Sequence, residues 1–192
     1  MKYCIANWKM NGSSKSITNW IEGISETISS KKQLNCLFCP PVCYVSLAAS
    51  LIKEYRLQIL LGAQDIDSKI DLDLTGGVSS EMLVDLGCKF VIIGHSERRI
   101  LLNEEEDILL SKLTSALDGG LKIVYCVGET ERERSLGQSK EIIKKQLRII
   151  KDLPLDSFMI AYEPVWSIGT GKVADISYID TMHGIIKNNL EL

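Results

Sequence analysis

The segment FMIAYEPVWSIGTGK, residues 158–172, places a single carboxylate, Glu163, at the end of a short apolar run. Pro164 follows Glu163 directly, and the segment closes with Gly169 and Gly171. A carboxylate at the mouth of a buried strand, beside a loop that is stiff at its start and free at its end, is typical of a general base beneath a closing lid. Taken alone, the Glu-Pro pair is more typical of a strand that ends in a charged turn. The rest of the chain decides between the two interpretations.

Short apolar runs alternate along the chain with stretches of helical periodicity. The apolar runs predict strands at residues 3–7, 36–39, 57–63, 89–93, 122–127 and 158–162. The periodic stretches predict helices at residues 14–30, 44–55, 79–87, 104–118, 131–151 and 175–190. A strand-to-strand spacing of about 25–35 residues is the length of a βα unit that returns to a parallel neighbour. The sequence therefore predicts an α/β fold of six βα units in one domain, residues 1–192.

Local signals support two of these helices. Ser79 or Ser80 can cap the helix predicted at 79–87, and Gly87 is suited to end it. The helix predicted at 131–151 pairs a strongly charged face with an apolar one, which is typical of a helix that is solvated on its outer side.

Parallel βα repeats form either an open doubly wound sheet or a closed barrel. A nucleotide-binding sheet normally has a Gly-rich turn after its first strand, but the first strand here leads into NWKMNG, residues 7–12. The GTGK at 169–172 is not a phosphate-binding P-loop either, because Trp166 stands where the first Gly should be and Val173 replaces the Ser or Thr. The sequence therefore favours a parallel barrel.

Polar residues gather where the predicted strands end. They are Asn7, Lys9, His95, Glu97, Cys126, Glu129 and Glu163. In a parallel barrel the carboxyl ends of all strands open on one face. Strand alternation places Lys9, His95 and Glu163 on the inward sides of their strands. One lysine, one histidine and one glutamate are therefore expected to point into the same mouth.

The composition limits the partners of the chain. A net charge of −3 and a pI near 5.5 provide no basic field for nucleic acid. No run of about 18 apolar residues occurs and no secretory signal is evident, so we expect a cytoplasmic protein without membrane contact. Cys36, Cys39 and Cys43 have a suggestive spacing, but no second cluster or paired His completes a metal site. We expect reduced thiols, no metal, and small molecules or another protein as partners.

Five motifs carry a resemblance to a known enzyme family. They are NWKMNG at 7–12, GAQD at 62–65, VIIGHSERR at 91–99, YCVGET at 125–130 and AYEPVWSIGTGK at 161–172. In this order, and over essentially the whole chain, they resemble the triosephosphate isomerase family. The resemblance implies a TIM barrel and an aldose–ketose isomerase of glycolysis and gluconeogenesis, which interconverts dihydroxyacetone phosphate and D-glyceraldehyde 3-phosphate through an enediolate. It implies no metal and no organic cofactor.

The resemblance also implies roles for the main site residues. Glu163 is the base that abstracts and returns the proton. His95 is a neutral imidazole, near a helix N-terminus at 96–99, and donates to the developing oxyanion; the family is itself a standard example of this pairing. Lys9 supplies positive charge to the phosphorylated substrate, and Asn7 orients a substrate oxygen.

Three further residues have supporting roles in this interpretation. The resemblance implies that the Gly169 N–H binds the substrate phosphate beneath the lid. Glu97 is either a partner of Lys9 or a local ion partner of Arg98. Cys126 either supports the site or is simply a small buried residue.

The length of the chain departs from the family pattern. A complete barrel of this class has about 250 residues, whereas this chain reaches Leu192 at the end of its sixth predicted helix. We therefore expect a chain without the last two βα units. The alternative to an active isomerase is then an inactive or phosphate-binding-only remnant. A different barrel enzyme acting on a sugar phosphate is disfavoured by the specific lid sequence.

The resemblance implies a homodimer in which segment 65–79 reaches into the partner subunit. Thr75 and Gly76 fit the family pattern. Gly77, however, stands where the family usually has an acidic residue thought to pair with an arginine such as Arg98. Homodimerisation is therefore an expectation from the resemblance that this position weakens.

Overall fold

The computed structural model describes residues 3–30, 35–68 and 74–191. Its strands are β1 (Tyr3–Asn7), β2 (Asn35–Cys39), β3 (Ile59–Ala63), β4 (Phe90–Ile93), β5 (Lys122–Val127) and β6 (Phe158–Tyr162). Its α-helices are α1 (Ser14–Ser30), α2 (Val45–Glu54), α3 (Ser80–Asp85), α4 (Ser96–Leu101), α5 (Glu106–Asp118), α6 (Glu131–Ser135), α7 (Ser139–Arg148) and α8 (Ile176–Leu190). Short 3-10 helices are η1 (Val42–Tyr44), η2 (Leu155–Ser157) and η3 (Val165–Ser167). The strands follow one another in chain order, which confirms the predicted βα array.

The chain divides into two compact units, and each is described by itself. Unit 1 comprises residues 1–92 and 112–123, and unit 2 comprises residues 93–111 and 124–192. Strands β4 and β5 contribute residues to both. The organisation of residues 1–192 as one domain stays a prediction.

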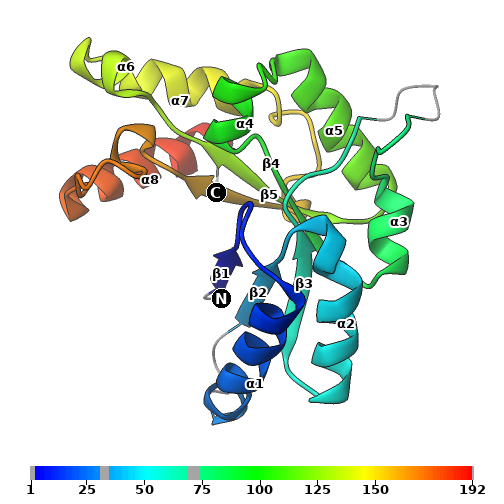
Figure 1. The fold of residues 1–192 in the computed structure, drawn as a ribbon. Helices are drawn as coiled ribbons and strands as arrows, with labels where there is room; N and C mark the ends of the chain where they lie inside the picture. The colour runs from blue at the N-terminus through cyan, green and yellow to red at the C-terminus, as the bar shows by residue number, and fades with distance from the viewer. Residues whose placement is uncertain (1–2, 31–34, 69–73, 192) are drawn as a thin grey trace. The chain divides into compact units, whose positions relative to one another are not determined.

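Unit 1 contains a parallel ladder. β1 pairs with β2 from Tyr3–Asn35 to Asn7–Cys39, and β3 continues the ladder on β2 and then on β4. Figure 1 shows α1 and α2 alongside these first strands, and the two helices contact each other. Ile17 and Ile21 of α1 are fully buried, because residues four positions apart lie on one face of a helix.

An aromatic cluster completes the core of unit 1. The ring of Phe38 in β2 lies 4.4 Å from that of Trp20 and 5.3 Å from that of Trp8, measured between centroids. Phe38 is fully buried and contacts both tryptophans. The cluster fixes the segment after β1, in which Trp8 directly precedes Lys9.

Unit 2 is organised around the ends of β5 and β6. Helices α7 and α8 lie against each other (Figure 1). Met182, Ile186 and Leu190 of α8 recur every four residues and are all buried, as expected of an amphipathic helix. None of the described helices is long and apolar enough to cross a membrane.

Most predicted elements are confirmed within a few residues, and the cap of α3 is resolved in favour of Ser79. The Ser79 side chain accepts a hydrogen bond from the Met82 N–H at 3.3 Å. Gly87, with φ +89°, follows the end of α3 as predicted.

The single helix predicted at 131–151 is wrong, because the chain forms α6 and α7 with a break between them. Gly137 has φ +71°, a left-handed conformation that glycine adopts without steric cost. Its N–H donates to the Arg134 carbonyl at 2.9 Å, and the Gln138 N–H donates to the Glu133 carbonyl at 2.9 Å. This pattern ends α6, so the helical periodicity of the sequence continues across a turn.

The prediction that strand alternation orients Lys9 and His95 is also wrong, because neither residue lies in a strand. β1 ends at Asn7, and Lys9 lies in a turn with φ +50°. β4 ends at Ile93, and Gly94, with φ +76°, redirects the chain before His95. The orientation of both side chains is set by turn geometry and not by a strand.

Candidate active site

Glu163 is held at the end of β6 by its own backbone. The Glu163 N–H donates to the Val127 carbonyl of β5 at 2.8 Å, which continues the pairing one residue beyond β6. A Cβ atom at Gly128 would lie 1.8 Å from the Glu163 carbonyl oxygen. No other residue type fits this approach, so Gly128 allows Glu163 to lie directly against the end of β5.

Arg99 fixes the turn that carries His95. Its Nε donates to the Gly94 carbonyl at 2.6 Å, and its Nη2 donates to the Cys126 carbonyl at 3.0 Å. The guanidinium also lies over the Tyr125 ring, 5.4 Å from the centroid. This one side chain therefore joins the residue before His95 to β5.

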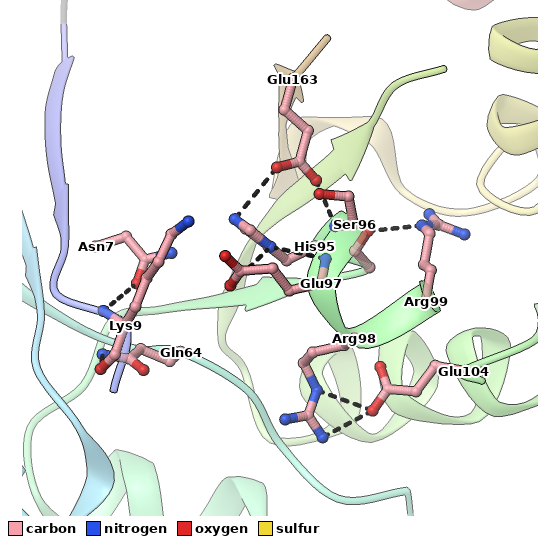
Figure 2. Close-up of polar contacts among 11 residues, drawn as sticks. Asn7, Lys9, Gln64, His95, Ser96, Glu97, Arg98, Arg99, Glu104 and Glu163 are labelled. Atoms are coloured by element: carbon pink, nitrogen blue, oxygen red, sulfur yellow. Dashed lines mark hydrogen bonds and ion pairs between the residues drawn. The ribbon is translucent and has the colours of Figure 1, made fainter. Parts of the chain in front are cut away.

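His95 is the N-cap of α4, and its side chain has a defined hydrogen-bonding pattern (Figure 2). The Glu97 N–H donates to His95 Nδ1 at 3.3 Å. A nitrogen that accepts a hydrogen bond carries no proton, so in the neutral ring the proton lies on Nε2. The Glu97 carboxylate Oε2 lies 3.6 Å from the same Nδ1, which is longer than a hydrogen bond. The helix N-terminus predicted at 96–99 is confirmed by α4, which begins at Ser96.

His95 and Glu163 contact each other directly. His95 Nε2 lies 3.2 Å from Glu163 Oε2, and the Ser96 N–H donates to Glu163 Oε1 at 2.6 Å (Figure 2). Their side chains are only 13% and 15% exposed. Each carboxylate oxygen therefore has at least one donor, and the imidazole Nε2–H is directed at a base. A partly buried pair of this kind is suited to moving protons at a bound substrate.

Asn7, Lys9 and Gln64 form a connected group in unit 1. The Lys9 N–H donates to Asn7 Oδ1 at 2.9 Å, which supports the left-handed turn at Lys9. Gln64 Nε2 donates to the Lys9 carbonyl and to the Cys39 carbonyl, both at 2.9 Å. Figure 2 shows the Asn7 contact and the position of Gln64 beside Lys9. The sequence identifies Gln64 only as part of the GAQD motif. The structure shows that its side chain also positions the backbone carbonyls of Lys9 and Cys39.

The loop after Glu163, for which a lid is predicted, has a left-handed backbone at its two glycines. Gly169 and Gly171 have φ +68° and +76°, and a Cβ at either position would meet no heavy atom within 4 Å. Thr170 Oγ1 donates to the Trp166 carbonyl at 2.9 Å. The two glycines therefore lie at an unobstructed loop tip, and the Thr170 hydroxyl links this tip to η3.

Glu129 anchors the start of this lid, a role that the sequence analysis missed. Its carboxylate is fully buried and accepts hydrogen bonds from Trp166 Nε1 at 2.8 Å and from the Tyr178 hydroxyl at 2.8 Å. The Tyr162 hydroxyl lies 3.1 Å and 3.0 Å from its two oxygens. Burial, and next the Glu129 charge, raises the pKa of Tyr162. The position after a predicted strand was the only sequence signal for Glu129.

Arg134 of α6 strengthens the anchor from outside. Its guanidinium carbon lies 3.8 Å from the centroid of the Trp166 ring and 5.4 Å from that of Tyr178. A guanidinium over an indole face is a favourable cation–π arrangement. Trp166 is therefore held by a carboxylate at its N–H and by a cation at its face.

The remaining predicted residues have these contacts. Cys126 is buried, and its carbonyl accepts the Arg99 bond described above. Arg98 binds Glu104, with Nη2 and Nε at 2.8 Å and 2.9 Å from Oε1. Five of the predicted site residues belong to unit 2: His95, Glu97, Cys126, Glu163 and Gly169. The other two, Asn7 and Lys9, belong to unit 1. Among the described residues, no group of three or more His, Cys, Asp or Glu side chains could hold a metal ion.

The fold and the site define an α/β protein built of βα units, with a histidine–carboxylate pair suited to proton transfer. A family model described as Triosephosphate isomerase matches residues 2–192. The triosephosphate isomerase of Polynucleobacter asymbioticus is 42% identical over 193 residues, which cover 97% of this chain and 76% of that protein. Proteins of the same name from Azoarcus sp. and Vibrio parahaemolyticus are 37% and 35% identical, and the alignments cover 76% and 73% of their lengths and 97% and 95% of this chain.

The chain belongs to the triosephosphate isomerase family. The resemblance, the predicted TIM-barrel class and the predicted isomerase class are thereby confirmed.

Proposed function

We propose that this chain interconverts dihydroxyacetone phosphate and D-glyceraldehyde 3-phosphate by moving a proton between adjacent carbons. The observation that carries the proposal is the 3.2 Å contact between His95 Nε2 and Glu163 Oε2 in a largely buried setting. An enediolate intermediate needs a base for the carbon-bound proton and a donor for the developing oxyanion. These two side chains supply one group of each kind.

Glu163 is proposed as the base that removes the proton from one carbon and returns it to the next. In the structure its oxygens accept from His95 and from the Ser96 N–H. A substrate that inserts beside His95 replaces Glu163 Oε2 as the acceptor of the Nε2–H. This exchange frees the Glu163 carboxylate to accept the carbon-bound proton. It also places the His95 Nε2–H at the substrate oxygen.

His95 is proposed to act as a neutral donor throughout. The Glu97 N–H to Nδ1 supports this proposal, because it favours the tautomer with the proton on Nε2. Arg99 binds the carbonyl of Gly94, the residue before His95, and so fixes the backbone from which the imidazole projects. A preorganised donor needs no rearrangement when charge develops on the substrate oxygen.

We also propose roles for the other predicted residues. Lys9 supplies positive charge to the phosphorylated substrate, Asn7 orients a substrate oxygen through its amide, and Glu97 is a charge partner for Lys9. The Gly169 N–H binds the phosphate, because its left-handed backbone lies at an unobstructed lid tip. Cys126 supports the site through the carbonyl that binds Arg99.

The lid protects the intermediate in this proposal. An enediolate next to a phosphate tends to eliminate that phosphate, so the site must exclude water until the proton returns. The Glu129 and Arg134 contacts to Trp166 define one stable position of the lid start. Closure over substrate then requires these contacts to be exchanged for contacts to the phosphate.

A coupled assay with the 192-residue chain tests the proposal. We expect turnover by the parent chain and a fall in kcat of at least about 100-fold in Glu163→Gln and in His95→Gln. His183→Gln is the control for loss of an imidazole, because this histidine is exposed on α8, where its ring lies 6.1 Å from that of Tyr162. It should stay within about twofold of the parent, as surface substitutions usually do.

Two outcomes would contradict the proposed activity. One is a parent chain that binds a phosphate-bearing enediolate analogue but shows no turnover. The other is a Glu163→Gln variant that retains kcat within about tenfold of the parent, because loss of a required base costs more than this.

We further propose that the chain forms a homodimer in the cytoplasm. The proposal rests on membership of the triosephosphate isomerase family. In unit 1, Met10 is 97% exposed and Leu74, within the 65–79 segment, is 58% exposed, so both side chains are accessible to a partner. Sedimentation equilibrium at micromolar concentration should give a dimer that Leu74→Ser weakens, and a purely monomeric parent would remove this part of the proposal.

A further inference from the structure

Cys4 and Cys36 are direct neighbours on adjacent parallel strands. The register of β1 on β2 pairs the Cα atom of Cys4 with that of Cys36. Directly paired residues on parallel strands project their side chains on the same face of the ladder. Neighbouring strands are about 4.8 Å apart, which lies inside the Cα separation of about 4.4–6.8 Å that disulfides require. Both cysteines are free thiols.

The two thiols differ in accessibility. Cys4 is exposed, whereas Cys36 is half-buried. Burial, and next to it the neighbouring Cys4, raises the pKa of Cys36. Cys4 is therefore the thiol that an external reagent meets first, and Cys36 is suited to react second, inside the protein. Cys43 is also exposed but lies in η1, outside the strand ladder, and so provides an internal comparison.

We propose that Cys4 and Cys36 form a dithiol site that a low-molecular-weight disulfide converts reversibly to an intramolecular disulfide. The Cys4 thiolate attacks one sulfur of the disulfide RSSR, forms a mixed disulfide and expels RS⁻. The Cys36 thiol then gives up its proton, its sulfur attacks Cys4 Sγ, and the second RS⁻ leaves. The two cysteine sulfurs lose two electrons, RSSR gains them, and two RSH form after protonation.

The exposure of Cys4 also predicts that this bridge is labile. Exposed disulfides have higher reduction potentials than buried ones, and a thiol from solvent reopens them readily. The oxidised form therefore attaches β1, the strand that ends at Asn7, covalently to β2 until a thiol reduces it.

Oxidation of the folded chain by glutathione disulfide at neutral pH, followed by peptide mass mapping, tests the proposal. The parent should lose two of its six thiols to a Cys4–Cys36 cross-link, with no glutathione retained at either residue. Cys36→Ser should instead keep glutathione on Cys4, with a lifetime at least about tenfold longer than in the parent. Cys43→Ser is the control and should cross-link like the parent.

Each other result overturns the inference. A stable glutathione adduct on Cys4 in the parent would show that Cys36 does not reach it. An unmodified Cys4 under conditions that modify Cys43 would show that the site is closed to disulfides. A cross-link that excess reduced thiol fails to reopen would contradict the predicted lability.

Discussion

Replacing Glu129 by leucine should destabilise the chain strongly, because its buried carboxylate accepts from one buried donor and two half-buried donors. They are Trp166 Nε1, the Tyr178 hydroxyl and the Tyr162 hydroxyl, at distances between 2.8 and 3.1 Å. A buried donor left without its acceptor costs about 1–3 kcal/mol. Trp166 bears this cost in full, whereas the two hydroxyls are half-buried and that of Tyr178 also donates to Ser139 Oγ at 2.9 Å, so we expect a loss of about 2–5 kcal/mol in the free energy of unfolding. Glu129→Gln keeps one acceptor oxygen and should lose less, about 1–3 kcal/mol.

Urea unfolding followed by far-UV circular dichroism measures these losses. Glu131→Gln is the matched control on the adjoining helix α6. Its carboxylate lies 3.1 Å from Lys172 Nζ, but both side chains are about half exposed, at 51% and 55%. An exposed pair of this kind contributes less than about 1 kcal/mol. If Glu129→Leu unfolded within about 1 kcal/mol of the parent, the carboxylate would not be the organising acceptor of the lid anchor.

Three further variants or conditions test other parts of the structure. Gly128→Ala should lower kcat by at least about 100-fold, because its Cβ would lie 1.8 Å from the Glu163 carbonyl and displace the base; a coupled assay checks this. Gln64→Leu leaves the Lys9 and Cys39 carbonyls without their common donor and should raise KM more than it lowers kcat, with about 1–3 kcal/mol lost in urea unfolding. Burial raises the pKa of Cys39 from 9.0 to about 12, so its neutral form stabilises the fold fully below pH 9.0, and this contribution is lost as the pH rises towards about 12. The melting temperature should fall over that range, and less steeply in Cys39→Ala.

The order of elements could be predicted from the sequence because each strand of this fold is short, apolar and followed by a helix of clear periodicity. Strands β1, β5 and β6 have the predicted bounds. The break between α6 and α7 could not be predicted from periodicity, because Leu136 and Ile143 lie seven positions apart across it, about two helical turns. Gly137 was the local signal, but its effect depends on a left-handed backbone that only the structure reveals.

The identity of the site residues was easier to predict than the means by which they are held. Glu163 and His95 were predicted from their positions at strand ends, and the structure brings them into contact. Their placement depends on bonds to backbone carbonyls, which leave little trace in a sequence, such as the bond from the Arg99 side chain to the Gly94 carbonyl. Glu129 was missed as an anchor because its donors are more than thirty positions away along the chain.

The end of β5 positions both members of the proposed catalytic pair. The Cys126 carbonyl accepts from Arg99, which fixes the turn before His95, and the next carbonyl, that of Val127, accepts from the Glu163 N–H. Gly128 then allows the close approach of Glu163. The backbone of residues 126–128 thus sets the separation of His95 and Glu163. The Cys126 side chain does not take part in these contacts. A proton transfer that tolerates little misplacement is therefore supported by three backbone positions together with the Arg99 side chain that binds the first of them.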